Sequence, residues 1–145
     1  MRVLGIDFGD KRIGLAVSDK LGLTAQSLGH YETKNREEDK KYFKELVSKY
    51  EIGEIVIGFP LRMDGTQGLR VEKTKEFAEW LQKTLNLPII FWDERLTTQQ
   101  ALRILSEQKM KHKMKKNLKD QISAAIILSS YMESKRKKPH GNQNR

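Results

Sequence analysis

The first third of the chain alternates apolar residues with small or polar ones, as β-strands do. Residues 3–8 form a short, mainly apolar run that carries Asp7 near its end. Gly9-Asp10 follows as a turn signal, and residues 13–17 then place an apolar side chain at every second position. This period of two predicts a hairpin with one buried face. A weaker strand is expected at about 23–32.

The middle of the chain changes between helical spacing and short apolar runs. Apolar residues repeat at helical spacing over 37–50 and 71–85, which predicts two amphipathic helices. Continuous apolar runs at 54–59 and 88–92 predict two buried strands. Pro60 ends the first of these runs, because proline lacks the N–H donor that a central strand needs.

Two further helices are expected in the last third. One can be capped by Thr97 or Thr98 and has apolar residues at 101, 102 and 105. The other is expected to open at Asp120, so that its first turn would favour the ionised carboxylate. Apolar residues at helical spacing support this last helix, namely Ile122, Ala125, Ile126 and Tyr131.

The element order β-β-β-α-β-α-β-α-α predicts an α/β fold. The opening hairpins make the first three strands antiparallel, whereas strands joined by helices are parallel with right-handed crossovers. A mixed five-stranded sheet with helices on both faces follows. We expect one domain over residues 1–135, with residues 136–145 as a basic flexible tail.

The amino-acid composition excludes several kinds of functional site. The 145 residues contain no cysteine, which excludes a disulfide framework, a thiolate metal site and a cysteine nucleophile. Hydrophobic residues make up 37% and charged residues 32%, a balance that is still compatible with a folded core. No apolar run approaches the roughly 18 residues of a membrane span. We therefore expect a soluble cytoplasmic domain.

The net charge of +9 is concentrated in the last quarter of the chain. Residues 109–145 hold eleven Lys or Arg and two acids, while the remainder is neutral. A dense basic segment gains free energy from phosphate contacts and counterion release. Lys109–Lys116 therefore favours a nucleic-acid partner, whereas Lys135–Lys138 is equally consistent with a solvated, solubilising tail.

Carboxylates follow two of the predicted parallel strands. Asp7 ends the first strand and Asp93-Glu94 follows the last, and the carboxyl ends of parallel strands form the working edge of such sheets. Asp7 and Glu94 side by side would repel each other unless a cation lay between them. With Asp120 as a third candidate, these oxygens suit Mg²⁺ or Mn²⁺ and a two-metal phosphodiester site.

Each acid also has an ordinary structural explanation. Asp7 could be a turn former, Asp93-Glu94-Arg95 a loop with a local ion pair, and Asp120 a helix cap. Trp80 and Trp92 are expected in the core rather than as stacking platforms. The three histidines have no paired partner in the sequence and are assigned no chemistry: His30, His112 and His140.

Four motifs occur in order and together resemble the YqgF family of Holliday-junction-resolvase-like proteins, also called pre-16S rRNA nucleases. The resemblance extends over residues 1–134. Each motif alone is weak, but four in order at this chain length are specific. They are Gly5–Gly14, Gly58–Pro60 with Asp64–Thr66, Asp93–Thr97, and Asp120–Ala125.

The resemblance implies an RNase H-like fold and a metal-dependent nuclease that acts in the bacterial cytoplasm on the 5′ end of pre-16S rRNA. It places the family's acidic residues at Asp7, Glu94 and Asp120. Asp10 departs from the family pattern, in which a small residue is more common, and could either help to bind metal or weaken phosphate approach. The candidate nucleic-acid contacts are Lys11, Arg12, Arg95, Lys113, Lys115 and Lys116.

Three other functions remain open at this stage. A Holliday-junction resolvase needs two active sites and hence a symmetric dimer, and cleavage of a four-way junction rather than an rRNA precursor would distinguish it. The sequence leaves the oligomeric state, monomer or homodimer, open. A non-catalytic RNA-binding ribosome-assembly factor would need the basic segment but no metal. The Gly5–Gly9 hairpin also resembles the first phosphate loop of actin-like ATPases and sugar kinases, although those enzymes need two lobes of this size.

Overall fold

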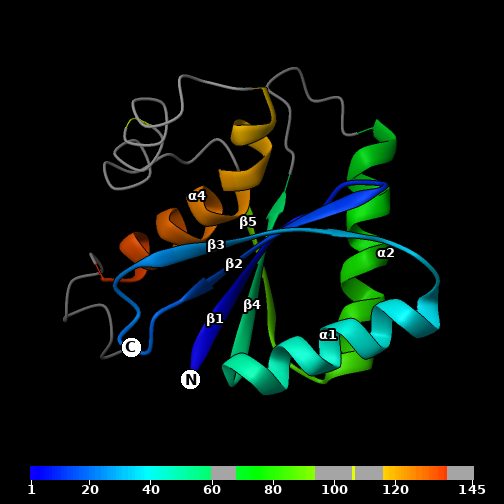
Figure 1. Cartoon of the computed structure of the whole chain (residues 1–145), viewed down its shortest axis with the longest axis horizontal. Helices are drawn as coiled ribbons and strands as arrows, with labels where there is room; N and C mark the ends of the chain where they lie inside the picture. The colour runs from blue at the N-terminus through cyan, green and yellow to red at the C-terminus, as the bar shows by residue number, and fades with distance from the viewer. Residues whose placement is uncertain (60–67, 94–105, 107–115, 137–145) are drawn as a thin grey trace.

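The chain forms a mixed sheet between two layers of helices (Figure 1). The structure is a computed structural model that describes residues 1–59, 68–93, 106 and 116–136. The helix expected around residues 101–105 lies outside these residues. The described elements are β1 (Arg2–Asp7), β2 (Arg12–Ser18), β3 (Ala25–Glu32), α1 (Arg36–Tyr50), β4 (Ile52–Phe59), α2 (Gly68–Leu85), β5 (Ile89–Asp93) and α4 (Lys116–Arg136).

The five strands lie in the order β3-β2-β1-β4-β5. The pairs β1–β2 and β2–β3 are antiparallel, and β4 pairs in parallel with both β1 and β5. The expected mixed sheet with three antiparallel opening strands is therefore confirmed. Helices α1 and α2 provide the crossovers that parallel pairing requires.

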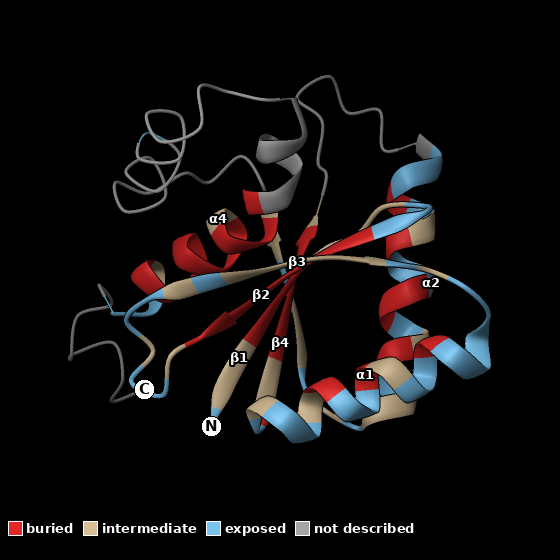
Figure 2. Cartoon of the chain, in the orientation of Figure 1, coloured by how far each residue is buried: buried red, intermediate tan, exposed pale blue. Residues whose placement is uncertain are grey.

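Residues of opposite parity along β1 bury their side chains on opposite faces of the sheet. Leu4 and Ile6 belong to the cluster that packs under α1 and α2, together with Phe43 and Leu81. The other face packs against α4 and has smaller residues, such as Ala16 of β2. Figure 2 shows buried positions on both the strands and the inner sides of these helices.

Both tryptophans pack against these two clusters, as expected. Trp80 of α2 is partly buried against the α1 and α2 side, and Trp92 of β5 against the α4 side. The rings of Trp92 and Tyr131 meet edge to face at 5.7 Å. Within the described residues, no helix combines the length and the apolar character that crossing a bilayer requires.

Helix α4 begins four residues earlier than the sequence pattern predicts. It starts at Lys116, so the expectation that Asp120 opens it is wrong, and Asp120 lies in the second turn. The residues from 116 to 119 include two lysines and a leucine, which are good helix formers, so no local signal stops the helix from extending toward the N-terminus. The first turn of α4 contains no acidic residue.

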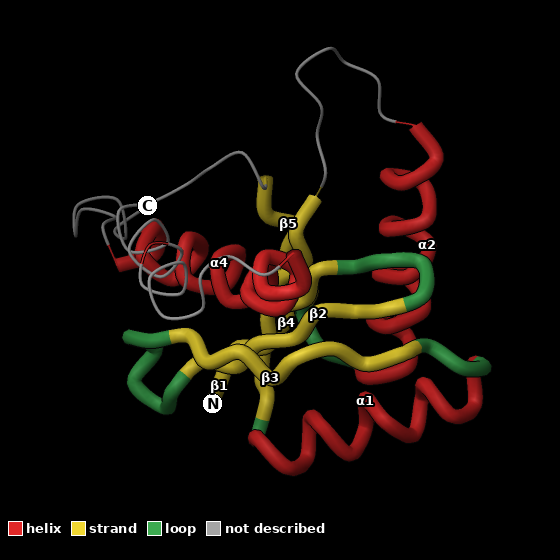
Figure 3. The backbone as a smooth tube through the Cα atoms, turned by 45° about the horizontal axis from the view of Figure 1, so that its top comes forward, coloured by secondary structure: helices red, strands yellow, loops and turns green. Residues whose placement is uncertain are grey.

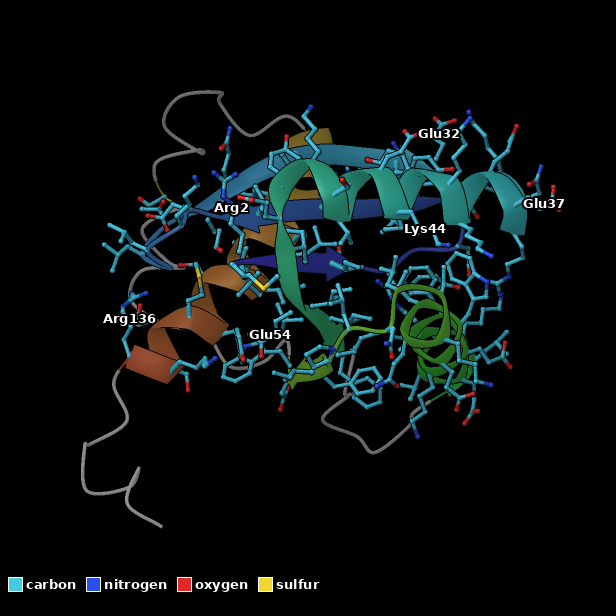
Figure 4. The ribbon with its side chains drawn as sticks, turned by 90° about the horizontal axis from the view of Figure 1, so that it is seen from below. Arg2, Glu32, Glu37, Lys44, Glu54 and Arg136 are labelled. Atoms are coloured by element: carbon cyan, nitrogen blue, oxygen red, sulfur yellow. The ribbon has the colours of Figure 1, made fainter. Side chains whose placement is uncertain are left out.

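The end of α4 is fixed at the edge of the sheet where β1 and β4 begin. Tyr131 donates a hydrogen bond of 2.9 Å to Glu54 Oε2, and Lys135 Nζ lies 3.6 Å from Glu54 Oε1. Arg136 donates to the carbonyl of Gly22 in the β2–β3 turn. Figure 4 shows the same end of the molecule with Glu54 and Arg136 labelled. The opposite end of α4 therefore lies toward the carboxyl ends of β1 and β4.

The hydrogen bond from Tyr131 to Glu54 requires the phenol of Tyr131 to keep its proton. Burial first, and then the hydrogen bond to Glu54, raise the pKa of Tyr131 above its ordinary value. The hydroxyl therefore remains a donor at neutral pH, and Glu54 accepts from it while also facing Lys135.

Gly5 lets α4 approach β1 closely. A Cβ built on Gly5 would lie 2.8 Å from Leu128 Cβ and 3.0 Å from the Ala124 carbonyl oxygen. Real Cβ atoms essentially never come as close as the 2.8 Å to Leu128, the 3.0 Å to Ala124 is unusually tight, and neither neighbour is the end of a flexible side chain. Glycine at this position is therefore a packing requirement.

We predict that Gly5→Ala lowers the free energy of unfolding by about 1–3 kcal/mol, because the added methyl group forces α4 away from the sheet. Chemical denaturation measures this difference. Lys44→Ala, on the exposed side of α1, is the control and should change stability by less than about 0.5 kcal/mol. Equal stability of Gly5→Ala and the parent chain would contradict the close contact.

Candidate active site

The strand register brings the carboxyl ends of β1, β4 and β5 to one edge of the sheet. Ile6 is opposite Ile57, and two residues further along, Phe59 is opposite Asp93. Strands β1 and β5 therefore end on the same side of the sheet, with β4 between them (Figure 3). Asp7 and Asp93 are the last residues of these two strands. Because neighbouring strands are about 4.8 Å apart, the backbones of β1 and β5 are separated by roughly 10 Å.

Asp7 presents a half-buried carboxylate at this edge. Its side chain is 21% exposed, and Arg70 Nη2 lies 3.9 Å from its Oδ1. The same guanidinium nitrogen donates a hydrogen bond of 3.3 Å to the carbonyl of Phe8. A cation from the first turn of α2 therefore faces the carboxylate at the end of β1.

Sequence reasoning did not find Arg70. Arg70 is 62 residues away along the chain from Phe8, whose carbonyl accepts its hydrogen bond. It lies in the first turn of α2, and the apolar periodicity of that helix predicts only which face is buried. The β-α-β connection from β4 through α2 to β5 places the first turn of α2 beside Asp7. No local pattern encodes such a contact.

The turn between β1 and β2 is tight and is fixed to α2. A Cβ on Gly9 would lie 2.5 Å from the carbonyl oxygen of Arg12, so only glycine fits the turn. Asp10 Oδ1 lies 3.3 Å from Lys73 Nζ of α2. This ion pair gives Asp10 a structural role beside the two considered from the sequence, because it holds the turn against α2.

A pocket of about 290 Å³ opens beside Asp7. Lys11 and Arg12, both predicted to contact phosphate, line it and are exposed. Arg70 and His30 line it as well, although no pattern in the sequence assigns them there. The pocket therefore surrounds the carboxylate of Asp7 with groups that attract an anion.

The structure places the other predicted site residues only in part. Lys116 is the first residue of α4, and Asp120 lies one helical turn before Ala124, whose carbonyl oxygen approaches Gly5. Since α4 enters from the carboxyl edge, Asp120 lies on the Asp7 side of that contact. The remaining candidates lie outside the described residues: Glu94, Arg95, Lys113 and Lys115.

Asp7 is suited to bind a divalent metal ion, but the described residues do not form a whole metal site around it. The Asp7 carboxylate provides hard oxygen atoms, the ligand type that Mg²⁺ and Mn²⁺ prefer. In the part of the chain that the structure describes, no three potential ligand side chains cluster around one point. Glu94 and Asp120 stay predicted ligands, since Glu94 lies outside the described residues and only the backbone position of Asp120 is described.

The similarity to known proteins covers nearly the whole chain. A family model described as "RuvX: Holliday junction resolvase" matches residues 1–134. A protein of Halothermothrix orenii named "Putative pre-16S rRNA nuclease" is 47% identical over 137 residues, which cover 94% of this chain and 98% of that protein. A protein of the same name from Clostridium acetobutylicum is 48% identical over 134 residues, with 92% and 99% covered.

Solved structures with the same fold are more distant in sequence. Thermus thermophilus RuvC in complex with a Holliday junction substrate superposes with a TM-score of 0.60 at 15% identity, covering 94% of this chain and 97% of that one. The fowlpox virus Holliday junction resolvase gives a TM-score of 0.52 at 13% identity, with 92% and 99% covered.

These structures confirm the RNase H-like fold that the sequence resemblance implies. At such low identity they show the fold alone. The family follows from the close relatives and from the match over residues 1–134, and the chain belongs to the RuvX family, also called YqgF.

Proposed function

We propose that this chain is a metal-dependent nuclease that hydrolyses phosphodiester bonds in the 5′ region of pre-16S rRNA. The observation that carries the proposal is the half-buried Asp7 carboxylate in a pocket lined by Lys11 and Arg12. The family and the names of its members support the reaction class. This function places the chain in the bacterial cytoplasm, where ribosomes are assembled.

In this proposal Asp7, Glu94 and Asp120 hold Mg²⁺ or Mn²⁺ at the carboxyl edge of the sheet. Bound divalent ions activate a water nucleophile and stabilise the leaving oxygen in phosphodiester hydrolysis. Asp7 contributes a ligand at the end of β1, where its backbone is paired with Gly14 of β2 and the preceding residue, Ile6, is paired with Ile57 of β4. Placing a ligand on a paired strand keeps the geometry of the site reproducible.

The proposed roles of Lys11 and Arg12 follow from their places in the fold. Lys11 and Arg12 are exposed at the β1–β2 turn and can bind phosphates on either side of the one that is cut. We propose that four further residues extend this contact along the nucleic acid: Arg95, Lys113, Lys115 and Lys116. Cations spread over a surface suit a structured RNA, because they bind its backbone without reading its bases.

A Holliday-junction resolvase is the second candidate function. The description of the family model and the resolvases of the same fold favour it. It requires two copies of the chain to cut two strands symmetrically, whereas processing of one RNA end requires only one copy. A monomer in solution that cuts rRNA precursor would therefore support the RNA function.

We predict that Asp7→Asn reduces metal-dependent cleavage of a small-subunit rRNA precursor by about 100-fold or more, because it removes a charged ligand from the site. The measurement is a cleavage time course in Mg²⁺, in Mn²⁺ and in EDTA, with a four-way DNA junction tested in parallel. The control is Glu45→Gln, which removes one negative charge on the exposed side of α1.

The outcomes of this experiment separate the candidate functions. Cleavage of the junction but not of the RNA would favour the resolvase. Salt-sensitive RNA binding without cleavage of either substrate would identify a non-catalytic binding factor. Equal cleavage by Asp7→Asn and the parent chain, with contaminating nuclease excluded, would refute the assignment of Asp7.

We further predict that Arg70→Gln tightens Mn²⁺ binding about two- to tenfold at low salt, because it removes a positive charge 3.9 Å from Asp7. Isothermal titration calorimetry measures the affinity. Lys75→Gln is the matched control, since it makes the same change of charge at an exposed position further along α2. Unchanged or weaker Mn²⁺ binding in Arg70→Gln would contradict a metal site at Asp7 with which this guanidinium competes.

A further inference from the structure

One row of residues crosses the three antiparallel strands at the candidate site. Asp7 of β1 is opposite Gly14 of β2, and Gly14 is opposite His30 of β3. Residues directly opposite one another in antiparallel strands present their side chains on the same face. Asp7 and His30 therefore share a face of the sheet, with a glycine between them.

The packing of neighbouring residues identifies this face as the one that α4 covers. Ala16, two residues beyond Gly14, belongs to the α4-side cluster. Tyr31, next to His30, packs on the opposite face, where its ring stacks on Tyr42 of α1 at 3.8 Å. Side chains alternate along a strand, so His30 lies on the face of Ala16 and of α4.

Three residues with ionisable side chains thus surround Gly14 on this face of the sheet. Arg12 precedes it by two residues on the same face, Asp7 lies on one side of it and His30 on the other. All three side chains line the 290 Å³ pocket. Two antiparallel steps of about 5 Å each separate the backbones of Asp7 and His30 by roughly 10 Å, enough for a phosphate group to lie between the side chains.

The chemistry of the pocket favours an anion beside His30. Lys11, Arg12 and Arg70 line the same pocket, while its two carboxylates, those of Asp7 and Asp10, face Arg70 and Lys73 respectively. An imidazole N–H is a hydrogen-bond donor in both the neutral and the protonated ring. A phosphodiester oxygen placed near Asp7 would meet that donor together with the positive charges of Lys11 and Arg12.

We propose that His30 is a substrate-binding residue that donates an N–H hydrogen bond to a phosphodiester oxygen of the nucleic acid. The inference rests on the proposed function and adds a contact from β3 to it. It assigns to the edge strand of the sheet a role in positioning the phosphate opposite Asp7.

The test is a binding titration that does not depend on cleavage. A fluorescently labelled small-subunit rRNA precursor fragment is titrated with the full chain carrying Asp7→Asn, so that no strand is cut. We expect His30→Ala in this background to weaken binding about three- to tenfold, the loss of one hydrogen bond to a charged group. His30→Gln, which keeps an N–H donor, should retain part of the affinity.

Gln26→Ala is the matched control, because Gln26 is an exposed residue of the same edge strand outside the pocket lining. Thermal unfolding of all variants establishes that β3 remains paired. His30→Ala binding as tightly as Gln26→Ala would overturn the inference, as would equal losses for His30→Ala and His30→Gln. The nuclease proposal is decided separately, by metal-dependent cleavage with the parent chain.

Discussion

The close contact between α4 and β1 at Gly5 determines where the rest of the candidate site can lie. Because Gly5 has no side chain, the backbone of Ala124 and the Cβ of Leu128 approach the strand directly. Two residues beyond this contact β1 ends at Asp7, and one helical turn before Ala124 lies Asp120. In the proposed function, this one contact therefore sets how far along the strand and along the helix the two acids lie from each other.

The same arrangement explains why the acidic and the basic parts of the proposed site come from different kinds of structure. Asp7 ends a strand that pairs with β2 and β4, and its own backbone is paired with Gly14 of β2, so the Cα from which its carboxylate extends is held by the sheet. Lys11 and Arg12 are exposed at a turn, where long side chains can adapt to a substrate. Metal ligation requires a narrow range of distances, whereas phosphate neutralisation tolerates a wide one.

The sequence predicts the parts of the structure that depend on local periodicity. The alternation in β2 and the helical spacing in α1 and α2 correspond to real elements, and Asp7 at a strand end follows from the same alternation. The start of α4 was predicted wrongly, because Asp120 carries an N-cap signal while the preceding residues are themselves good helix formers. A capping residue type does not by itself end a helix.

Contacts across the sheet could not be predicted in this way. Arg70 reaches Asp7 through the crossover of α2, and His30 is aligned with Asp7 only through the registers of two strand pairs. The β2–β3 register contains an irregularity next to Leu15, and a shift of one residue would move His30 to the other face. Such a bulge is a property of the paired strands, which the alternation in either strand alone does not report.

The net charge of a chain segment does not show where its charged side chains gather in the fold. Residues 1–108 carry equal numbers of basic and acidic side chains, yet the pocket at Asp7 gathers Lys11, Arg12 and Arg70. The fold achieves this by using Lys73 to pair with Asp10. The neutral part of the chain can therefore present a locally anion-attracting pocket without the basic residues of the last quarter. In the proposed function, those later residues add affinity for the polyanion, while the phosphate is positioned at the β1–β2 turn.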